Sequence, residues 1–191
     1  ENVIINNKPS ISYTGPAQVC GNMVNLTSSA QVGAPSQLSA YFWYESGSSI
    51  GQGQTLNHTF STSPYANVNG HVIVESDAGC KDTTTYSVEL NTIPVANFIE
   101  GPPCTGLDIS FNNVSNWNGS AEPGSSLQYN WSFGDSQAST LEDPDHTYQQ
   151  AGTYQVTLIV SSSSSICVES ITKEIKVSEL PVSEFSVVEQ C

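Results

Sequence analysis

The 191-residue chain has no arginine and only four lysines, against 18 acidic residues, so its formal net charge is −14. A surface this acidic repels nucleic acid and anionic membranes, and its main benefit is solubility. We therefore expect the chain neither to bind nucleic acid nor to insert into a membrane.

Long apolar runs are also missing. No segment has the 18 or more consecutive apolar residues of a membrane-spanning helix, and no segment shows the apolar spacing of a helix. The first residues, Glu1-Asn2-Val3, lack the basic start and the apolar run of a secretory signal peptide. The abundance of Ser, Thr, Asn and Gly with few charged residues predicts an extracellular all-β protein rather than a helical one. The chain is expected to be either a mature product or a piece cut from a longer one.

The most regular part of the sequence lies between residues 127 and 160. Tyr129-Asn-Trp-Ser-Phe-Gly-Asp135 is followed by Pro144-Asp-His-Thr-Tyr148 and by Gly152-Thr-Tyr-Gln-Val-Thr-Leu-Ile-Val160. Apolar residues alternate with polar ones in the first and third of these segments, as in strands that bury one face. Gly134-Asp135 ends the first strand with turn residues, and Gly152 opens the last.

This pattern, W-x-F-G-D followed by H-T-Y and then G-T-Y-x-V-x-L, closely resembles the polycystic kidney disease (PKD) domain. The resemblance covers about 85 residues, and its three parts occur in the family's order. It implies a small immunoglobulin-like sandwich of antiparallel strands. It implies little about function, because sandwiches of this kind have many binding roles.

One junction recurs three times along the chain. Pro9, Pro94 and Pro181 are 85 and 87 residues apart (94 − 9 and 181 − 94). Each is followed by a cysteine, namely Cys20, Cys104 or Cys191. Repeats of this length predict tandem domains, and short junctions with proline favour a semi-rigid row of them.

The repeat defines the expected domains. Residues 1–8 are predicted as the last strand of a preceding repeat, and residues 9–92 as a degenerate PKD or immunoglobulin-like domain, in which Glu45-Ser46-Gly47 stands in place of F-G-D. Residues 93–179 are predicted as a PKD domain, and residues 180–191 as the first strand of a following repeat.

Five cysteines lie at repeating positions. We predict one disulfide per repeat, Cys20–Cys80 and Cys104–Cys167, with Cys191 left unpaired by truncation. Each would close a loop long enough to stabilise its domain by about 4 kcal/mol. Metal binding is the alternative, but no C-x-x-C or His-rich spacing supports it. Disulfides would indicate an oxidising location, at the cell surface or outside the cell.

Three carboxylates, Asp135, Asp143 and Asp145, lie in the turns after the Trp131 strand. They are a candidate calcium site, since calcium prefers hard oxygen ligands. The alternative is that Asp135 caps its own turn and that Asp143 and Asp145 start a strand. No other cofactor is expected.

Trp117 stands in a polar loop and could stack on a sugar ring, or it could cover an end of the sandwich. His58 and His146 occupy equivalent positions before Thr and an aromatic residue, which favours a packing role. No Ser/His/Asp set, H-E-x-x-H motif or phosphate-binding glycine loop can be assembled. We therefore expect no catalysis.

Acidic PKD-like repeats with disulfides resemble segments of the large adhesins and gliding-type filament proteins that Bacteroidota export by type IX secretion. The resemblance implies a structural segment of a long cell-surface stalk or filament that presents an adhesive tip. The partners would be neighbouring repeats, other copies of the chain, or a surface glycan or protein. The alternative is an accessory carbohydrate- or protein-binding module of a secreted hydrolase. A third hypothesis is that the domains pack laterally into an assembly of several chains.

Overall fold

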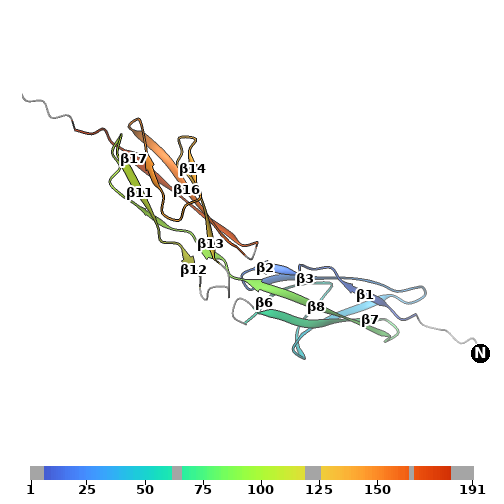
Figure 1. The fold of residues 1–191 in the computed structure, drawn as a ribbon. Helices are drawn as coiled ribbons and strands as arrows, with labels where there is room; N and C mark the ends of the chain where they lie inside the picture. Colours follow the sequence, from blue (N-terminus) through green and yellow to red (C-terminus); the bar gives the residue numbers. More distant parts are fainter. Residues whose placement is uncertain (1–6, 62–65, 119–125, 164–165, 182–191) are drawn as a thin grey trace, which may run out of the picture. The chain divides into compact units, whose positions relative to one another are not determined.

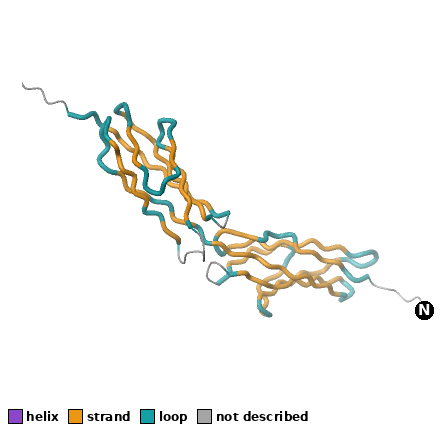
Figure 2. Tube along the Cα trace, viewed as in Figure 1, coloured by secondary structure: helices purple, strands orange, loops and turns teal. Residues whose placement is uncertain are grey.

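The computed structural model describes residues 7–61, 66–118, 126–163 and 166–181. All regular elements in these ranges are β-strands, and none is a helix (Figure 2). The chain divides into two compact units, with the division after Ile93. The sequence places the corresponding boundary between residues 92 and 93. Of the predicted flanking strands at 1–8 and 180–191, most residues lie outside the described ranges.

The first unit contains two sheets (Figure 1). One has three antiparallel strands in the order β1-β3-β6, and the other has five in the order β2-β8-β7-β4-β5. All pairings are antiparallel except that of β2 with β8, which is parallel. The strands are β1 (Ser10–Tyr13), β2 (Gln18–Cys20), β3 (Met23–Gln31), β4 (Leu38–Glu45), β5 (Ser48–Gln52), β6 (Thr55–Thr59), β7 (Asn67–Ser76) and β8 (Lys81–Asn91).

The core of the first unit follows from the period of two along these strands. Alternate residues of β3, β7 and β8 are buried, and Trp43 of β4 lies at the centre with none of its surface exposed. The buried residues of the main core cluster are Val24, Leu26, Trp43, Phe60, Val68, Val72, Tyr86, Val88 and Leu90.

The second unit has the same two-layer plan with shorter sheets (Figure 1). The orders are β14-β13-β16-β17 in one sheet and β10-β11-β15 in the other, and β9 pairs with β12. The strands are β9 (Pro94–Val95), β10 (Phe98–Glu100), β11 (Asp108–Asn113), β12 (Asn116–Trp117), β13 (Leu127–Ser132), β14 (Ala138–Ser139), β15 (Asp145–Thr147), β16 (Gly152–Ser162) and β17 (Val168–Val177). Its core is rich in aromatic rings, among them Phe98, Phe111, Trp131, Phe133 and Tyr148.

The sequence predicts one strand over residues 95–99, but the structure has two short ones there, β9 and β10. Asn97 separates them, because its side-chain oxygen accepts the backbone N–H of Phe98 at 2.9 Å. Its own N–H donates to the Ser115 hydroxyl at 3.0 Å. Asparagine side chains compete in this way with the regular hydrogen bonds of a strand.

In the first unit the chain enters beside the beginning of the last strand and leaves at that strand's far end. Lys8 contacts Asp82, the second residue of β8, at 2.7 Å, and the unit ends where β8 ends, at Asn91. In the second unit, Lys173 in the middle of β17 donates a hydrogen bond to the Phe98 carbonyl. Cys104 forms an isolated β-bridge with Ser178, just after that strand. The two points of attachment of the first unit are therefore about 30 Å apart, the length of a ten-residue strand.

Candidate functional site

The F-G-D turn and the H-T-Y segment of the second unit are joined by direct contacts. Asp135 Oδ2 lies 2.8 Å from His146 Nε2, and Asp135 Oδ1 accepts the backbone N–H of Gln137 at 3.1 Å. The imidazole of His146 is almost fully buried and stacks on Phe133, with ring centroids 4.1 Å apart. The motif thus forms a hydrogen-bonded clasp that joins the turn after β13 to strand β15.

Tyr148 completes this clasp from the other side. Its hydroxyl donates a hydrogen bond to the Phe133 carbonyl at 2.8 Å, and its ring meets His146 edge-on at 4.5 Å. Burial raises the pKa of the Tyr148 hydroxyl above its ordinary value, and the nearby Asp135 carboxylate adds to the shift. Each of these polar groups is engaged in fixing the turn.

Gly134 is required at this turn for a steric reason. Its φ is +81°, a conformation that L side chains rarely adopt. A β-carbon there would stand 2.8 Å from the Gln155 carbonyl oxygen, on the backbone of the neighbouring strand. The glycine therefore lets β16 pass close beneath the turn.

The first unit holds the equivalent turn with longer contacts. Glu45 Oε2 lies 3.7 Å from His58 Nε2, and His58 meets Phe60 edge-on at 4.6 Å. Phe60 has no hydroxyl to match that of Tyr148. The tryptophans, in contrast, are anchored alike: Trp43 Nε1 donates to the Gly53 carbonyl at 2.7 Å, and Trp131 Nε1 to the Leu141 carbonyl at 2.9 Å.

The three candidate calcium ligands have separate partners. Asp135 holds His146, whereas Asp143 accepts the backbone N–H of Asn113 at 2.7 Å. Asp145 is exposed on β15, where it pairs with Ser110. Within the described ranges no group of three or more acidic, His or Cys side chains could hold a metal ion. Asp135 accepts a hydrogen bond within its own turn and Asp145 begins β15, as in the alternative interpretation, and calcium binding stays a prediction.

Trp117 lies on the two-residue strand β12, where it pairs with Pro94 of β9. It is half-buried, and Pro94 is buried. Trp117 therefore lies beside the residue at which the chain enters the second unit. This position leaves part of its ring accessible to a ligand.

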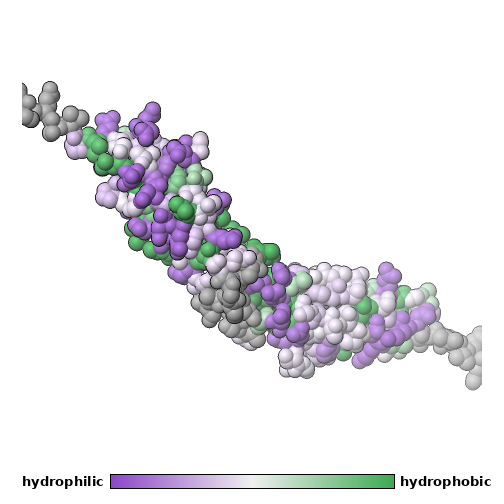
Figure 3. Space-filling view, viewed as in Figure 1, coloured by the Kyte–Doolittle hydropathy of each residue, from purple (hydrophilic) through white to green (hydrophobic). Residues whose placement is uncertain are grey.

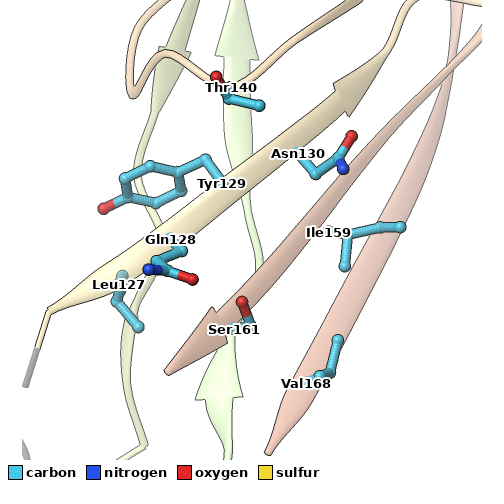
Figure 4. A pocket seen from close by; sticks show the side chains of 8 residues that line it. All are labelled: Leu127, Gln128, Tyr129, Asn130, Thr140, Ile159, Ser161 and Val168. Atoms are coloured by element: carbon cyan, nitrogen blue, oxygen red, sulfur yellow. The ribbon is translucent and has the colours of Figure 1, made fainter. Parts of the chain in front are cut away.

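An open depression that the sequence analysis missed lies on the outer face of the four-stranded sheet (Figure 4). Its volume is about 600 Å³. The side chains around it come from β13, β16, β17 and the loop after β14, and they are Leu127, Gln128, Tyr129, Asn130, Thr140, Ile159, Ser161 and Val168. Only a cross-strand register could have revealed this grouping, because the residues belong to strands distant in sequence.

The predicted disulfide pairings are wrong. Cys20 and Cys167 are disulfide-bonded, but Cys80 and Cys104 carry free thiols, so neither Cys20–Cys80 nor Cys104–Cys167 exists. Cys191 lies outside the described residues.

Strand register explains why these pairs cannot form. Cys20 of β2 lies beside Asn91 at the end of β8, whereas Cys80 precedes the start of that strand. The separation along β8 is 91 − 80 = 11 residues, or about 36 Å. A disulfide needs Cα atoms about 4.4–6.8 Å apart. Cys104 and Cys167 are separated in the same way by the full length of β17.

The surface is mostly polar. On the face shown in Figure 3, hydrophobic residues form small patches among hydrophilic ones. The exposed apolar side chains include Met23, Ile99, Leu141 and Ile166. None of the described elements is a helix of the length and apolarity needed to cross a membrane.

Comparison with known proteins supports the resemblance found in the sequence. The PKD domain family matches residues 91–177. The PKD1 domain of Vibrio anguillarum Epp is 30% identical over 46% of this chain and 96% of that domain, with a TM-score of 0.39. The fibronectin(III)-like modules of Clostridium thermocellum CbhA are 8% identical, over 94% of this chain and all of theirs, with a TM-score of 0.45.

Three N-terminal domains of the bacteriophage RB49 highly immunogenic outer capsid protein (Hoc) are 18% identical, over 90% of this chain and 59% of that one, with a TM-score of 0.43. The family match covers the clasp of Asp135, His146 and Tyr148 described above. Residues 91–177 are therefore a PKD domain, and the chain has a PKD-domain-like, all-β fold.

Proposed function

We propose that the chain is a structural or adhesive segment of a long extracellular protein, in which sandwich domains follow one another in a row. The observation that carries this proposal is the path of the chain through the first unit. It enters beside the start of the last strand, at Lys8 in the first unit, and leaves at that strand's far end, at Asn91. A domain with its attachment points at opposite ends adds its own length to a row.

Short connections support this role. Only Thr92 and Ile93 separate the last strand of the first unit from β9 of the second. A connection of two residues with a following proline has little conformational freedom compared with a Gly/Ser linker. In the proposed function, such domains act as spacers in a cell-surface stalk or filament that presents an adhesive tip, with no catalytic step of their own.

The contacts at the clasp also fit a spacer. Asp135, His146 and Tyr148 are bonded to one another or to the backbone, so they stabilise the turn. The high negative charge keeps neighbouring copies apart in solution, which suits a protein displayed at high density.

A second candidate is the accessory binding module, and one observation favours it. The depression beside Ile159 combines apolar side chains with the amides of Gln128 and Asn130, whereas the ring of Tyr129 lies on the other side of β13 and packs against the core (Figure 4). Apolar side chains with a few polar groups are typical of ligand sites. Binding of oligosaccharides that is lost in Asn130→Ala and retained in Trp117→Ala would assign the module role to this surface.

The experiment that tests the leading proposal is to determine the length and surface location of the polypeptide that carries this chain. Antibodies raised against residues 7–181 should label intact cells, and the labelled polypeptide should repeat the Pro-to-Cys junction every 84–87 residues. A short polypeptide with a catalytic domain beside these two units would overturn the stalk and favour the accessory module.

A further inference from the structure

Each unit carries one cysteine at each end of its last strand. Cys20 lies beside Asn91 at the end of β8, and Cys80 precedes the strand. In the second unit, Cys104 forms an isolated backbone β-bridge with Ser178 just after β17, and Cys167 precedes that strand. The separations along the strand are equal, 91 − 80 = 11 and 178 − 167 = 11 residues.

Hydrogen bonds show that the two cysteines at the exit of the chain are equivalent. In the first unit, the residue after Cys20 donates its backbone N–H to the Asn91 carbonyl at 2.7 Å. In the second, the residue after Cys104 donates to the Ser178 carbonyl at 2.9 Å. Both pairings are parallel, so both cysteines lie in the same relation to the departing chain.

The two cysteines at the other end are equivalent as well. The Cys80 carbonyl accepts the backbone N–H of Ser76 at 2.9 Å. The Cys167 carbonyl accepts that of Ser162 at 3.3 Å. Each serine is buried near the end of the preceding strand. Each unit therefore has one exit cysteine, Cys20 or Cys104, and one entrance cysteine, Cys80 or Cys167.

The bonding states differ between equivalent positions. The exit cysteine of the first unit, Cys20, is disulfide-bonded, and so is the entrance cysteine of the second, Cys167. The exit cysteine Cys104 and the entrance cysteine Cys80 are free and half-exposed. Since the two cysteines of a unit are about 36 Å apart, an exit or entrance cysteine can be oxidised only by a partner outside its own unit.

We infer that Cys104 and Cys80 are the two complementary halves of a disulfide that joins consecutive copies of the repeat. Cys104 bonds to the entrance cysteine of the following copy, and Cys80 bonds to the exit cysteine of the preceding one. The partner is thus a second domain of the same kind in the same row, and the inference rests on the proposed function. The inference is based on Cys20 and Cys167, which occupy the equivalent positions and are disulfide-bonded.

The reaction is a thiol–disulfide exchange with a small disulfide such as oxidised glutathione. One thiolate attacks glutathione disulfide and releases one reduced glutathione. The second thiolate then attacks the mixed disulfide and releases another. Two thiols are oxidised, one glutathione disulfide is reduced to two thiols, and the two protons end on the released glutathione.

The test uses a tandem chain in which residues 1–180 of one copy run directly into residues 9–191 of a second. This join puts Pro9 where Pro181 stands, so the 87-residue spacing is kept. Cys191→Ser is included to remove the terminal thiol. After equilibration with reduced and oxidised glutathione in 0.5 M salt, which screens the repulsion between the acidic copies, free thiols are alkylated before denaturation and the peptides are mapped by mass spectrometry.

The expected result is two alkylated cysteines, Cys80 of the first copy and Cys104 of the second, with a linked peptide joining Cys104 of the first copy to Cys80 of the second. Four alkylated cysteines in a tandem chain that melts like the single one would overturn the inference. So would links between two cysteines of the same kind.

Two variants of the tandem chain serve as matched controls. Cys104→Ser in the first copy should free Cys80 of the second and raise the number of labels to three. Cys80→Ser in the first copy should leave the linked peptide intact and lower the number to one. If the linked peptide is missing but the antibodies label long polypeptides on intact cells, the disulfide is rejected and the proposed function stands. If the linked peptide is found but no long polypeptide is labelled on cells, the surface role alone is rejected.

Discussion

The two units have the same two-layer fold, but different contacts secure the turn after the tryptophan strand. Both bury a tryptophan whose indole N–H donates to a backbone carbonyl ten residues later, at 2.7 Å for Trp43 and 2.9 Å for Trp131. Only the second unit has the close Asp135–His146 contact at 2.8 Å, whereas Glu45 and His58 are 3.7 Å apart. The tryptophan anchor is thus the shared element, and the F-G-D clasp is one way of securing the turn around it.

Core composition differs in the same direction. Phe98, Phe111, Trp131 and Phe133 form a connected series of rings in the second unit, with centroids 5.2–6.3 Å apart. In the first unit the rings are fewer and the valines and leucines of β3, β7 and β8 fill most of the core. Aromatic pairs contribute about 0.5–1.5 kcal/mol of stability beyond their buried area. Ring packing in the second unit therefore compensates for the stability lost through its shorter sheets.

The largest expected effect comes from removing either anchor. Trp131→Ala should lower the free energy of unfolding of the second unit by about 3–5 kcal/mol, because it leaves a large cavity and removes a hydrogen bond. Trp43→Ala should do the same to the first unit. Calorimetry should show that each variant shifts one melting transition and leaves the other in place. A shift of both transitions by the same amount would contradict independent cores.

The next largest effect distinguishes the Asp135–His146 contact from the Glu45–His58 contact. Asp135→Ala removes the partner of the buried His146, and we expect a loss of about 1–3 kcal/mol in the second unit. Glu45→Ala removes a longer and more exposed contact, so its cost to the first unit should be below about 1 kcal/mol. Chemical denaturation of both variants measures the difference, and equal losses would show that the 2.8 Å contact is not what distinguishes the units.

A smaller effect is expected for Tyr148→Phe, which makes the second unit resemble the first at the position of Phe60. It removes the buried hydrogen bond to the Phe133 carbonyl, and the free energy of unfolding should fall by about 1–2 kcal/mol. Tyr154→Phe is the matched control, since its hydroxyl donates to the Gln150 carbonyl at an exposed site. The control should lose less than Tyr148→Phe in the same denaturation experiment.

The last prediction concerns alkaline pH in the first unit, outside the neutral range of the others. Burial raises the pKa of Tyr86 to about 12, with a smaller contribution from Glu45. A raised pKa in the folded state means that the contribution to stability is complete below the unfolded pKa of about 10 and is lost as the pH rises from there through 12. The melting temperature of the first unit should fall over this range, and Tyr86→Phe should flatten the fall. An unchanged slope in that variant would exclude Tyr86 as the cause.

Local sequence patterns were enough to predict the sandwich and its PKD-like part. Alternation at Tyr129, Trp131 and Phe133 marks a strand with one buried face, and the structure buries Trp131 and Phe133 almost completely. The interruption at Asn97 was not predictable from alternation, because it depends on a hydrogen bond between the Asn97 N–H and the side chain of Ser115, eighteen residues away.

The disulfide pairing failed for a different reason. Counting cysteines per repeat pairs Cys20 with Cys80, but the count does not contain the direction of the strands. Only the parallel pairing of β2 with β8 places Cys20 at the far end of the strand that Cys80 precedes. The depression near Ile159 was missed for the same reason, since it depends on which strands become neighbours.

Lys173 has a consequence for the outer edge of the second unit. It stands on β17, the last strand of its sheet, in the row that also holds the buried Ile175. Its ammonium group lies 4.6 Å from the centre of the Phe98 ring and donates to the Phe98 carbonyl. A strand from another molecule that added to this ten-residue edge would have to accommodate an inward-pointing charge, a known defence against edge-to-edge aggregation. Crowded copies can thus remain separate molecules even where a long strand edge is open.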